Sequence, residues 1–232
     1  MRLAWSLALP VLFACSPPPP ASSVPSTPAA IGSIAAGAVQ LDALTIRGPS
    51  HYVTGYEATL PDGRVNAVIE IPTGTNAKWE VDKSDGSLRW EIKNGKPRVV
   101  QFLGYPGNYG MIPRTLLAAE EGGDGDPLDV IVLGEPLPRG TVIPVRLVAV
   151  LRLLDGGETD DKLVAVRDHT PFATVRDLDD LRARFPGVTE QLEGWFTSYK
   201  GPGEIVANGF ADAAAAMQVL RSAHETFERT SH

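Results

Sequence analysis

The sequence predicts an α+β fold, mainly β, in which a small antiparallel barrel or sandwich is followed by helices. Two observations predict the β part. Short runs of apolar and alternating residues recur from Val65 to Val166, and Gly, Pro, Asn and Asp turn signals separate them. The third observation predicts the helices, because apolar residues after residue 174 recur with helical spacing.

The strands follow from apolar runs that end at turn signals. The predicted strands are 65–71, 78–81, 88–92, 98–100, 141–154 and 163–166. Asp85-Gly86 and Asn94-Gly95 are hairpin signals between neighbouring strands. The range 141–154 is long enough for one bent strand or for two.

Three helices are predicted in the last third of the chain. Thr174 and Asp177 resemble a capping box at the start of the first helix, and Pro186-Gly187 stops it. Thr189 is a candidate cap for the second helix, which ends at the glycines of 201–203. The third helix is expected over 211–229.

Composition limits the classes of protein. The 232 residues suffice for one domain of about 150–200 residues and a tail. A net charge of −7 argues against a nucleic-acid surface, which needs basic stripes, so we expect no nucleic-acid partner. With one cysteine, the chain forms no intrachain disulfide.

The N-terminal residues resemble an export signal. Arg2 is followed by an apolar segment that is shorter than the about 20 residues of a membrane span, and we interpret 1–14 as a signal peptide. Leu12 to Cys15 resembles the lipobox of bacterial lipoproteins, although Phe13 is a less usual occupant of its position. The alternative is a plain signal peptide with a chance cysteine.

A lipidated Cys15 would anchor the chain to a membrane. The range 15–45 is rich in Pro, Ser and Ala and is expected to be a tether, with the folded domain at 46–232. These expectations place the protein in the bacterial cell envelope, lipid-anchored, on the periplasmic or the outer-membrane face.

The acidic stretch between Gly123 and Leu133 is the strongest chemical signal. Asp124, Asp126 and Asp129 lie within six residues, and an apolar run follows at once. Carboxylates this close raise one another's pKa values unless a cation lies among them, and hard cations such as Mg²⁺ prefer oxygen ligands. A second acidic turn contains Asp155 and Asp160, before Lys162.

Two other patterns are open to two readings each. Glu70 interrupts an apolar strand, so it is either a solvent-facing residue, which is the commoner case, or an inward acid of a site. The loop of Tyr105 and Tyr109 is either an ordinary turn with packed tyrosines or the lining of a phosphate pocket. Lys78 and Glu80 share one face of a strand.

Several motifs in series resemble the family I soluble inorganic pyrophosphatases. The motifs are VIEIP (68–72), AKWEVDK (77–83), GKPR (95–98), YPGNYG (105–110), the Asp-x-Asp-Pro-x-Asp-Val signature (124–130), DKLVAV (161–166) and SYK (198–200). The resemblance implies a five-stranded, OB-like closed barrel with flanking helices. It also implies hydrolysis of pyrophosphate to two orthophosphates by a water activated by several Mg²⁺ ions, with Mn²⁺ or other divalent cations as alternatives. The family forms homo-oligomers.

The resemblance also implies roles for individual residues. Metal ligands are Asp124, Asp126, Asp129, Asp155, Asp160 and Glu70, the last through water. Catalytic residues are Asp126, which accepts a proton from the attacking water, with Tyr109, Arg98 and Lys200. Substrate-binding residues are Lys78, Glu80, Arg98, Tyr109, Lys162, Tyr199 and Lys200, with Tyr105 in support.

Two alternatives stay open at this point. The connection 91–98 is longer than in compact bacterial members of the family, so Lys93 and Lys96 are rivals for the role of Arg98. The alternative function is a metal- or phosphate-binding envelope lipoprotein on the same fold, with little or no turnover. The stretch 120–123 has no assigned role.

Overall fold

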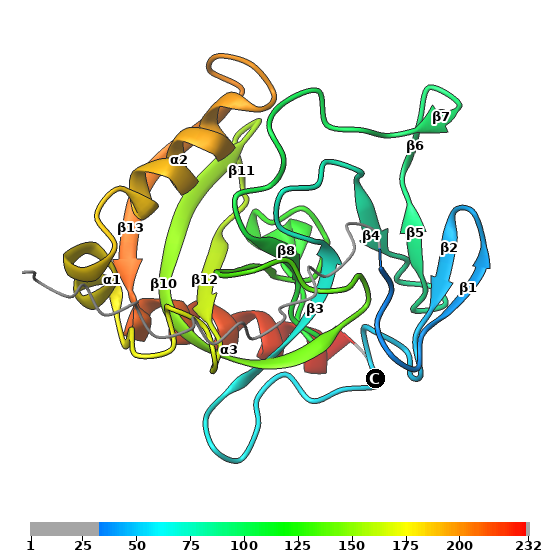
Figure 1. Cartoon of the computed structure of the whole chain (residues 1–232), viewed down its shortest axis with the longest axis horizontal. Coiled ribbons are helices and arrows are strands. Elements are labelled where there is room, and N and C mark those ends of the chain that lie inside the picture. The colour runs from blue at the N-terminus through cyan, green and yellow to red at the C-terminus, as the bar shows by residue number, and fades with distance from the viewer. Residues whose placement is uncertain (1–32, 231–232) are drawn as a thin grey trace, which may run out of the picture.

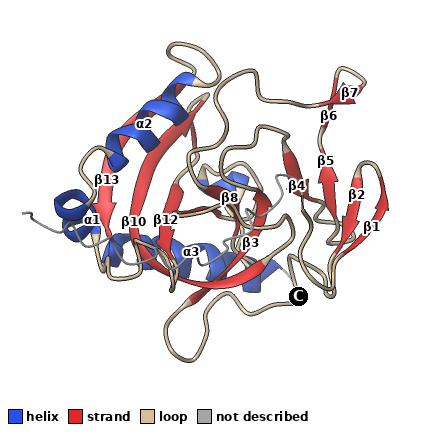
Figure 2. Cartoon of the chain, in the orientation of Figure 1, coloured by secondary structure: helices blue, strands red, loops and turns tan. Residues whose placement is uncertain are grey.

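The computed structural model describes residues 33–230 as a strongly curved sheet, with helices on its outside and a smaller sheet beside it (Figure 1). Figure 2 shows that strands make up most of the regular structure and that the main helices come late in the chain. The predicted class, α+β and mainly β, is confirmed.

Within residues 33–230 the main sheet has seven strands, and its longest strand pairs with several of the others. Its strands are β3 (Val65–Ile71), β8 (Asn108–Met111), β9 (Asp129–Val132), β10 (Val142–Asp155), β11 (Glu158–Thr159), β12 (Lys162–Val166) and β13 (Ile205–Asp212). The path β3–β8–β9–β12–β10 returns to β3, because β10 pairs with β12 and also with β3. β10 is one strand of 14 residues, not two.

The smaller sheet holds four short strands. They are β1 (Val39–Asp42), β2 (Thr45–Arg47), β5 (Leu88–Trp90) and β4 (Trp79–Val81), in that spatial order. β1 lies within the range expected to be a tether, so the folded part begins before residue 46. No strand forms at 98–100, because the Asn94-Gly95 turn joins an earlier hairpin, β6 (Ile92–Lys93) and β7 (Lys96–Pro97).

The helices begin at caps other than those expected. The described helices are η1 (Ala119–Glu121), α1 (Leu178–Arg184), α2 (Val188–Ser198) and α3 (Ala213–Thr230). Asp177, not Thr174, caps α1, and its carboxylate accepts a hydrogen bond from Asp180 N at 2.8 Å. Gly187 precedes α2 with φ of 91°, so the chain turns there and the helix starts before Thr189.

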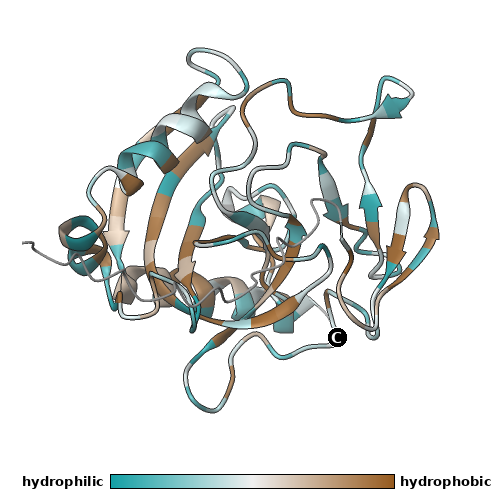
Figure 3. Cartoon of the chain, in the orientation of Figure 1, coloured by the Kyte–Doolittle hydropathy of each residue, from teal (hydrophilic) through white to brown (hydrophobic). Residues whose placement is uncertain are grey.

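Buried apolar residues fix the strands that carry the polar groups. Apolar colours follow the inner strands in Figure 3, and all five residues of β12 are buried. α3 packs Leu220 and Ala223 against one side of the main sheet, and α2 packs Trp195 and Phe196 against another cluster. Burial of each large apolar side chain stabilises the fold by about 1.5–3 kcal/mol, so the strand ends are held rigidly.

Candidate active site

One cleft of about 210 Å³ gathers most of the polar side chains that the sequence singled out between Glu70 and Lys200. It opens where β9 and β12 begin and where β10 ends. The predicted residues that line it are Glu70, Lys78, Glu80, Arg98, Tyr109, Asp124, Asp126, Asp129, Asp155, Asp160, Lys162, Tyr199 and Lys200. Cys15 lies outside the described residues.

The Asp124–Asp126 loop is shaped by its own backbone. Gly125 has φ of 79°, which favours glycine, and its N–H donates to Leu117 O at 2.7 Å. Leu117 N donates to Asp126 O at 2.9 Å, and Asp126 N donates to Asp124 Oδ1 at 2.9 Å. These bonds hold both aspartates at the cleft before β9 starts.

The strand register places Lys162 among the carboxylates. β9 and β12 are parallel and Asp129 pairs with Lys162, so the two side chains meet at the start of both strands. The Lys162 ammonium donates to Asp129 and to Asp160. Burial lowers the pKa of Lys162, but the two carboxylates outweigh burial and raise it. Lys162 is therefore a permanent cation of the site.

The acidic wall of the cleft consists of Glu70, Asp124, Asp126, Asp129, Asp155 and Asp160. Burial makes several of these carboxylates harder to ionise. Burial raises the pKa of Asp160 to about 6; Asp129 adds to this rise and Lys162 opposes it. Burial also raises the pKa of Asp124, and repulsion from Asp126 and Asp129 contributes. The wall thus carries more negative charge than its lysine compensates, which is an environment that attracts cations.

Glu70 is an inward acid, so the solvent-facing interpretation is wrong. Its side chain lies on β3 with 5 % of the residue exposed, and Oε1 accepts a hydrogen bond from Val81 N at 2.8 Å. Burial raises the pKa of Glu70 to about 8, against an opposing effect of Lys78. This bond also joins β3 to β4, which belong to different sheets.

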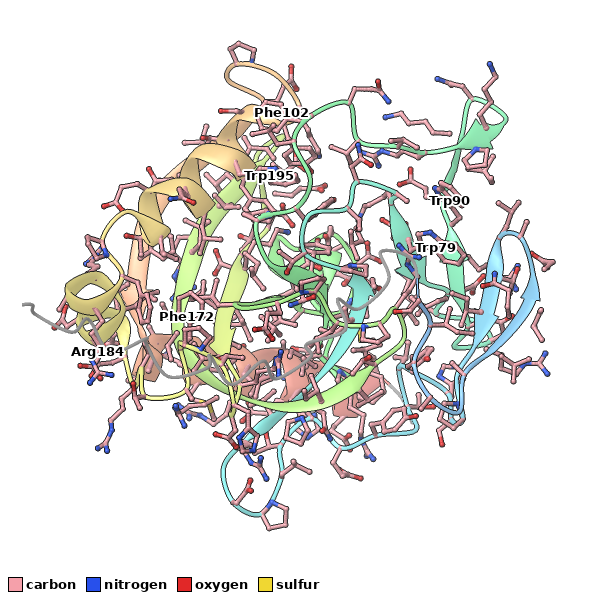
Figure 4. The ribbon with its side chains drawn as sticks, viewed as in Figure 1. Trp79, Trp90, Phe102, Phe172, Arg184 and Trp195 are labelled. Atoms are coloured by element: carbon pink, nitrogen blue, oxygen red, sulfur yellow. The ribbon has the colours of Figure 1, made fainter. Side chains whose placement is uncertain are left out.

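Cationic and phenolic groups face the acidic wall. Lys78 Nζ lies 2.8 Å from Glu80 and 5.1 Å from the Tyr109 ring centroid. Lys200, which follows the C-cap of α2, is paired with Asp155. Tyr199 stacks on Trp195 with 4.8 Å between ring centroids, and Trp195 is labelled in Figure 4. Each cation is thus close to an acid, yet oriented to the same cleft.

Of the two tyrosines in the glycine-rich loop, one lines the cleft and the other is a packed core residue. Tyr109 lines the cleft, whereas Tyr105 packs in the core against Trp195 with 4.4 Å between ring centroids. Gly110 is required beside Tyr109, because a Cβ there would lie 1.8 Å from Val68 O. Burial raises the pKa of Tyr109 well above its ordinary value, so its hydroxyl stays a neutral donor.

Of the three candidate cations in the connection 91–98, only Arg98 lines the cleft. Arg98 pairs with Glu91 at 2.7 Å, while Lys93 and Lys96 are exposed on the β6–β7 hairpin.

Sequence reasoning missed Lys83, whose ammonium lies 2.5 Å from Asp126 and 2.8 Å from Gly125 O. Strand alternation from Lys78 and Glu80 does not predict it, because β4 has already ended at Val81. The signal that could have found it is the lysine that closes the AKWEVDK motif.

The donor set fits hard divalent cations such as Mg²⁺. Carboxylate oxygens of Asp124, Asp126, Asp129 and Asp160 line one cleft, with no cysteine or histidine among its lining residues. Within residues 33–230, no three acidic or histidine side chains converge on one point as they stand. Lysine ammonium groups hold Asp126, Asp129 and Asp160, and Asp124 accepts a hydrogen bond from Asp126 N.

Comparisons with known proteins agree with this geometry. The family model described as inorganic pyrophosphatase matches residues 67–228. The mitochondrial inorganic pyrophosphatase 2 of Mus musculus is 36% identical over 184 residues, covering 70% of this chain and 56% of the relative. The chain spans between a half and two thirds of the length of the first curated relatives that it matches.

Solved structures give the same result. The inorganic pyrophosphatase of Schistosoma japonicum superposes with a TM-score of 0.74 at 29% identity, covering 80% of this chain and 75% of that one. A Trypanosoma cruzi vacuolar soluble pyrophosphatase lacking its N-terminal domain, in complex with PPi, gives 0.69 at 30% identity, with coverages of 75% and 72%. The chain therefore belongs to the inorganic pyrophosphatase family.

Proposed function

We propose that this protein hydrolyses inorganic pyrophosphate to two orthophosphates with the help of Mg²⁺. The observation that carries the proposal is the division of one cleft into an acidic wall and a wall of lysine, arginine and tyrosine side chains. Membership of the inorganic pyrophosphatase family supports it. So does the relative from Trypanosoma cruzi, whose structure is a complex with PPi.

In this proposal the acidic wall holds the metal ions. Asp124, Asp126, Asp129, Asp155 and Asp160 would hold the ions, and Glu70 would act through water; all six line the cleft. Bound Mg²⁺ lowers the pKa of a water molecule and neutralises phosphoryl oxygens. Asp126 would be the proton acceptor, the role that the family resemblance implies, and hydrogen bonds between its loop and Leu117 hold it at the cleft.

The opposite wall orients the substrate. Lys78, Arg98 and Lys200 offer charged donors there, and Tyr109 and Tyr199 offer neutral hydroxyls, while Lys162 adds a charged donor from the acidic wall. Such donors stabilise negative charge on the leaving phosphate. Glu80 holds Lys78 at 2.8 Å and so orients it. Because Lys162 contacts both Asp129 and Asp160, it holds two carboxylates of the acidic wall together.

A phosphate-release assay tests the proposal. Purified protein with Mg²⁺ should release phosphate from pyrophosphate far faster than from phosphomonoesters, and a chelator should stop the release. Mn²⁺ and other divalent cations are compared in the same assay. If the protein binds Mg²⁺ and phosphate without releasing product, the alternative of a binding protein without turnover replaces the proposal.

We also infer that the main sheet is a closed, five-stranded, OB-like barrel. The support is the ring of pairings β3–β8–β9–β12–β10–β3, which leaves no unpaired edge among these strands. β11 and β13 extend the ring at β10. Protection of the amides of β3 and β10 against hydrogen exchange, equal to that of β12, is the expected result.

The proposed location rests on the sequence of residues 1–15. We propose a signal peptide at 1–14 and a lipid on Cys15 that tethers the domain to the bacterial envelope. Within residues 33–230, no helix is long and apolar enough to cross a membrane. Growth with a labelled fatty acid should label the protein, and Cys15→Ser should abolish the label. Homo-oligomer formation is tested by light scattering of the soluble domain.

A further inference from the structure

Arg139 is a buried cation that the proposed chemistry does not use. It lies between β9 and β10 in the chain, with 6 % of the residue exposed. None of the ion pairs within residues 33–230 includes Arg139, and desolvation lowers its pKa to about 10. A buried charge without an ion pair costs stability, so its position calls for a compensating role.

The contacts of Arg139 join the two sheets directly behind the cleft. Its Nε donates to the backbone carbonyl of Glu70 on β3 at 2.8 Å. Its guanidinium lies 4.6 Å from the ring centroid of Trp79 on β4. β3 belongs to the main sheet and β4 to the smaller one, so a single side chain touches both.

One contact is with the backbone of Glu70, a proposed metal ligand, and the other is with Trp79, the neighbour of two proposed substrate-binding residues. Trp79 stands between Lys78 and Glu80, which line the cleft, while its own side chain is buried in the core. Figure 4 shows Trp79 beside Trp90, and their ring centroids are 5.6 Å apart. Trp79 Nε1 is buried without a hydrogen-bond partner among the described residues, so the indole is held by core packing and by its ring contacts.

The segment that precedes β1 covers Arg139. Ala35 N donates to Arg139 O at 2.8 Å, and Arg139 N donates to Ser33 O at 2.9 Å. Ile34 packs against the same apolar cluster as Trp79. Arg139 is therefore fixed by its backbone on one side, while its side chain holds Glu70 and Trp79 on the other.

We propose that Arg139 is a positioning residue, which sets the distance between the Glu70 carboxylate and the Lys78–Glu80 pair across the gap between the two sheets. The proposal rests on the proposed function, because Glu70 and Lys78 act there on metal and substrate. The hydrogen bond from Val81 N to Glu70 Oε1 joins β3 to β4 on the cleft side. Arg139 joins the same two strands on the other side, through the Glu70 carbonyl and the Trp79 ring.

The test compares Arg139→Met with a matched control, Arg146→Met. Arg146 also donates to backbone carbonyls, with Nη2 2.9 Å from Val175 O, but it does not line the cleft. Arg139→Met should lower kcat/KM for pyrophosphate by about 10- to 100-fold, as loss of a residue that orients a ligand does. The Mg²⁺ concentration for half-maximal activity should rise, and calorimetry should show weaker Mg²⁺ binding.

Arg146→Met should lower the melting temperature and leave kcat/KM within about twofold of the parent. Arg139→Lys keeps the charge but loses the planar group, so it should restore only part of the activity. If Arg139→Met does not fold, Arg139→Lys and Trp79→Leu decide, and both should weaken Mg²⁺ binding.

The proposal is overturned if folded Arg139 variants bind Mg²⁺ as the parent does, or lose no more activity than Arg146→Met. A parent protein that releases no phosphate would instead contradict the proposed function. In that case the calorimetric comparison of Mg²⁺ binding still decides the role of Arg139, because it needs no turnover.

Discussion

The two walls of the cleft are built in different ways. On the acidic wall, Asp124, Asp126 and Asp129 lie in one short segment, and backbone hydrogen bonds or strand pairing hold each of them. On the opposite wall, Lys78 directly precedes β4 and Lys200 follows α2, so the two lysines are far apart in the sequence. Their long side chains are placed by ion pairs with Glu80 and Asp155.

This difference separates what each wall contributes. The acidic wall is a rigid set of oxygen ligands, with too much negative charge for the protein alone. The opposite wall consists of flexible cations that can change partners from a carboxylate to a phosphate. We therefore expect changes on the acidic wall to reduce turnover and metal binding, and changes on the opposite wall to weaken use of the substrate.

The largest effect is expected from Asp126→Asn. The amide has nearly the same shape but accepts no proton, so kcat should fall by about 10²- to 10⁴-fold. Phosphate release at saturating substrate measures this change. Asp62→Asn is the control, since Asp62 is an exposed carboxylate paired with Arg64 and outside the cleft. If Asp126→Asn keeps parental kcat, Asp126 is not the base and the acidic wall only holds metal.

The next effect is expected from Arg98→Gln, which should lower kcat/KM by about 10²-fold through loss of a charged donor to the substrate. Lys93→Gln and Lys96→Gln should have no effect, because both lysines are exposed on the β6–β7 hairpin. Steady-state kinetics of the three variants measures the difference. A large loss in Lys93→Gln or Lys96→Gln, with Arg98→Gln active, would assign the role to the hairpin instead.

Mg²⁺ should stabilise the folded protein through the acidic wall. At a concentration of 100 times Kd, one bound ion adds about 2.7 kcal/mol to the free energy of unfolding, if it does not bind the unfolded chain. Thermal unfolding with and without Mg²⁺ measures the shift. Asp124→Asn should reduce it, whereas Lys78→Gln should leave most of it. A melting curve that Mg²⁺ does not move would contradict a metal site on this wall.

The parts of the fold that the sequence predicts are those with local signals. β3, β10 and β12 are apolar runs bounded by turns, so their positions follow from periodicity. β13 was missed because Asn208-Gly209 reads as a turn. In the structure Gly209 has φ of 78° within the strand, and the pairing with β10 is irregular between Leu151 and Leu153. Asn208-Gly209, which the sequence pattern favours as a turn, therefore lies at an irregularity within the strand.

The cleft residues follow from motifs, but their partners do not. The contact of Lys162 with Asp129 depends on the parallel register of β9 and β12, a long-range pairing. Burial of Glu70 depends on the smaller sheet covering β3, which leaves no local trace. Lys83 reaches Asp126 only because the chain leaves β4 in that direction. The identity of the cleft residues can thus be predicted from local sequence motifs, whereas the contacts between their side chains depend on the tertiary structure.

The smallest effect is expected away from both walls, at the start of α1. Asp177 caps the helix through Asp180 N, so Asp177→Ala should lower the free energy of unfolding by about 1 kcal/mol. Thr174→Ala should cost less, because the Thr174 hydroxyl accepts a bond from Arg184 but caps no backbone N–H. Urea unfolding measures both, and kcat should equal that of the parent in each. An equal loss of unfolding free energy in the two variants would support the capping box that the sequence alone favours. A loss of kcat in either variant would mean that the helices help to hold the walls of the cleft.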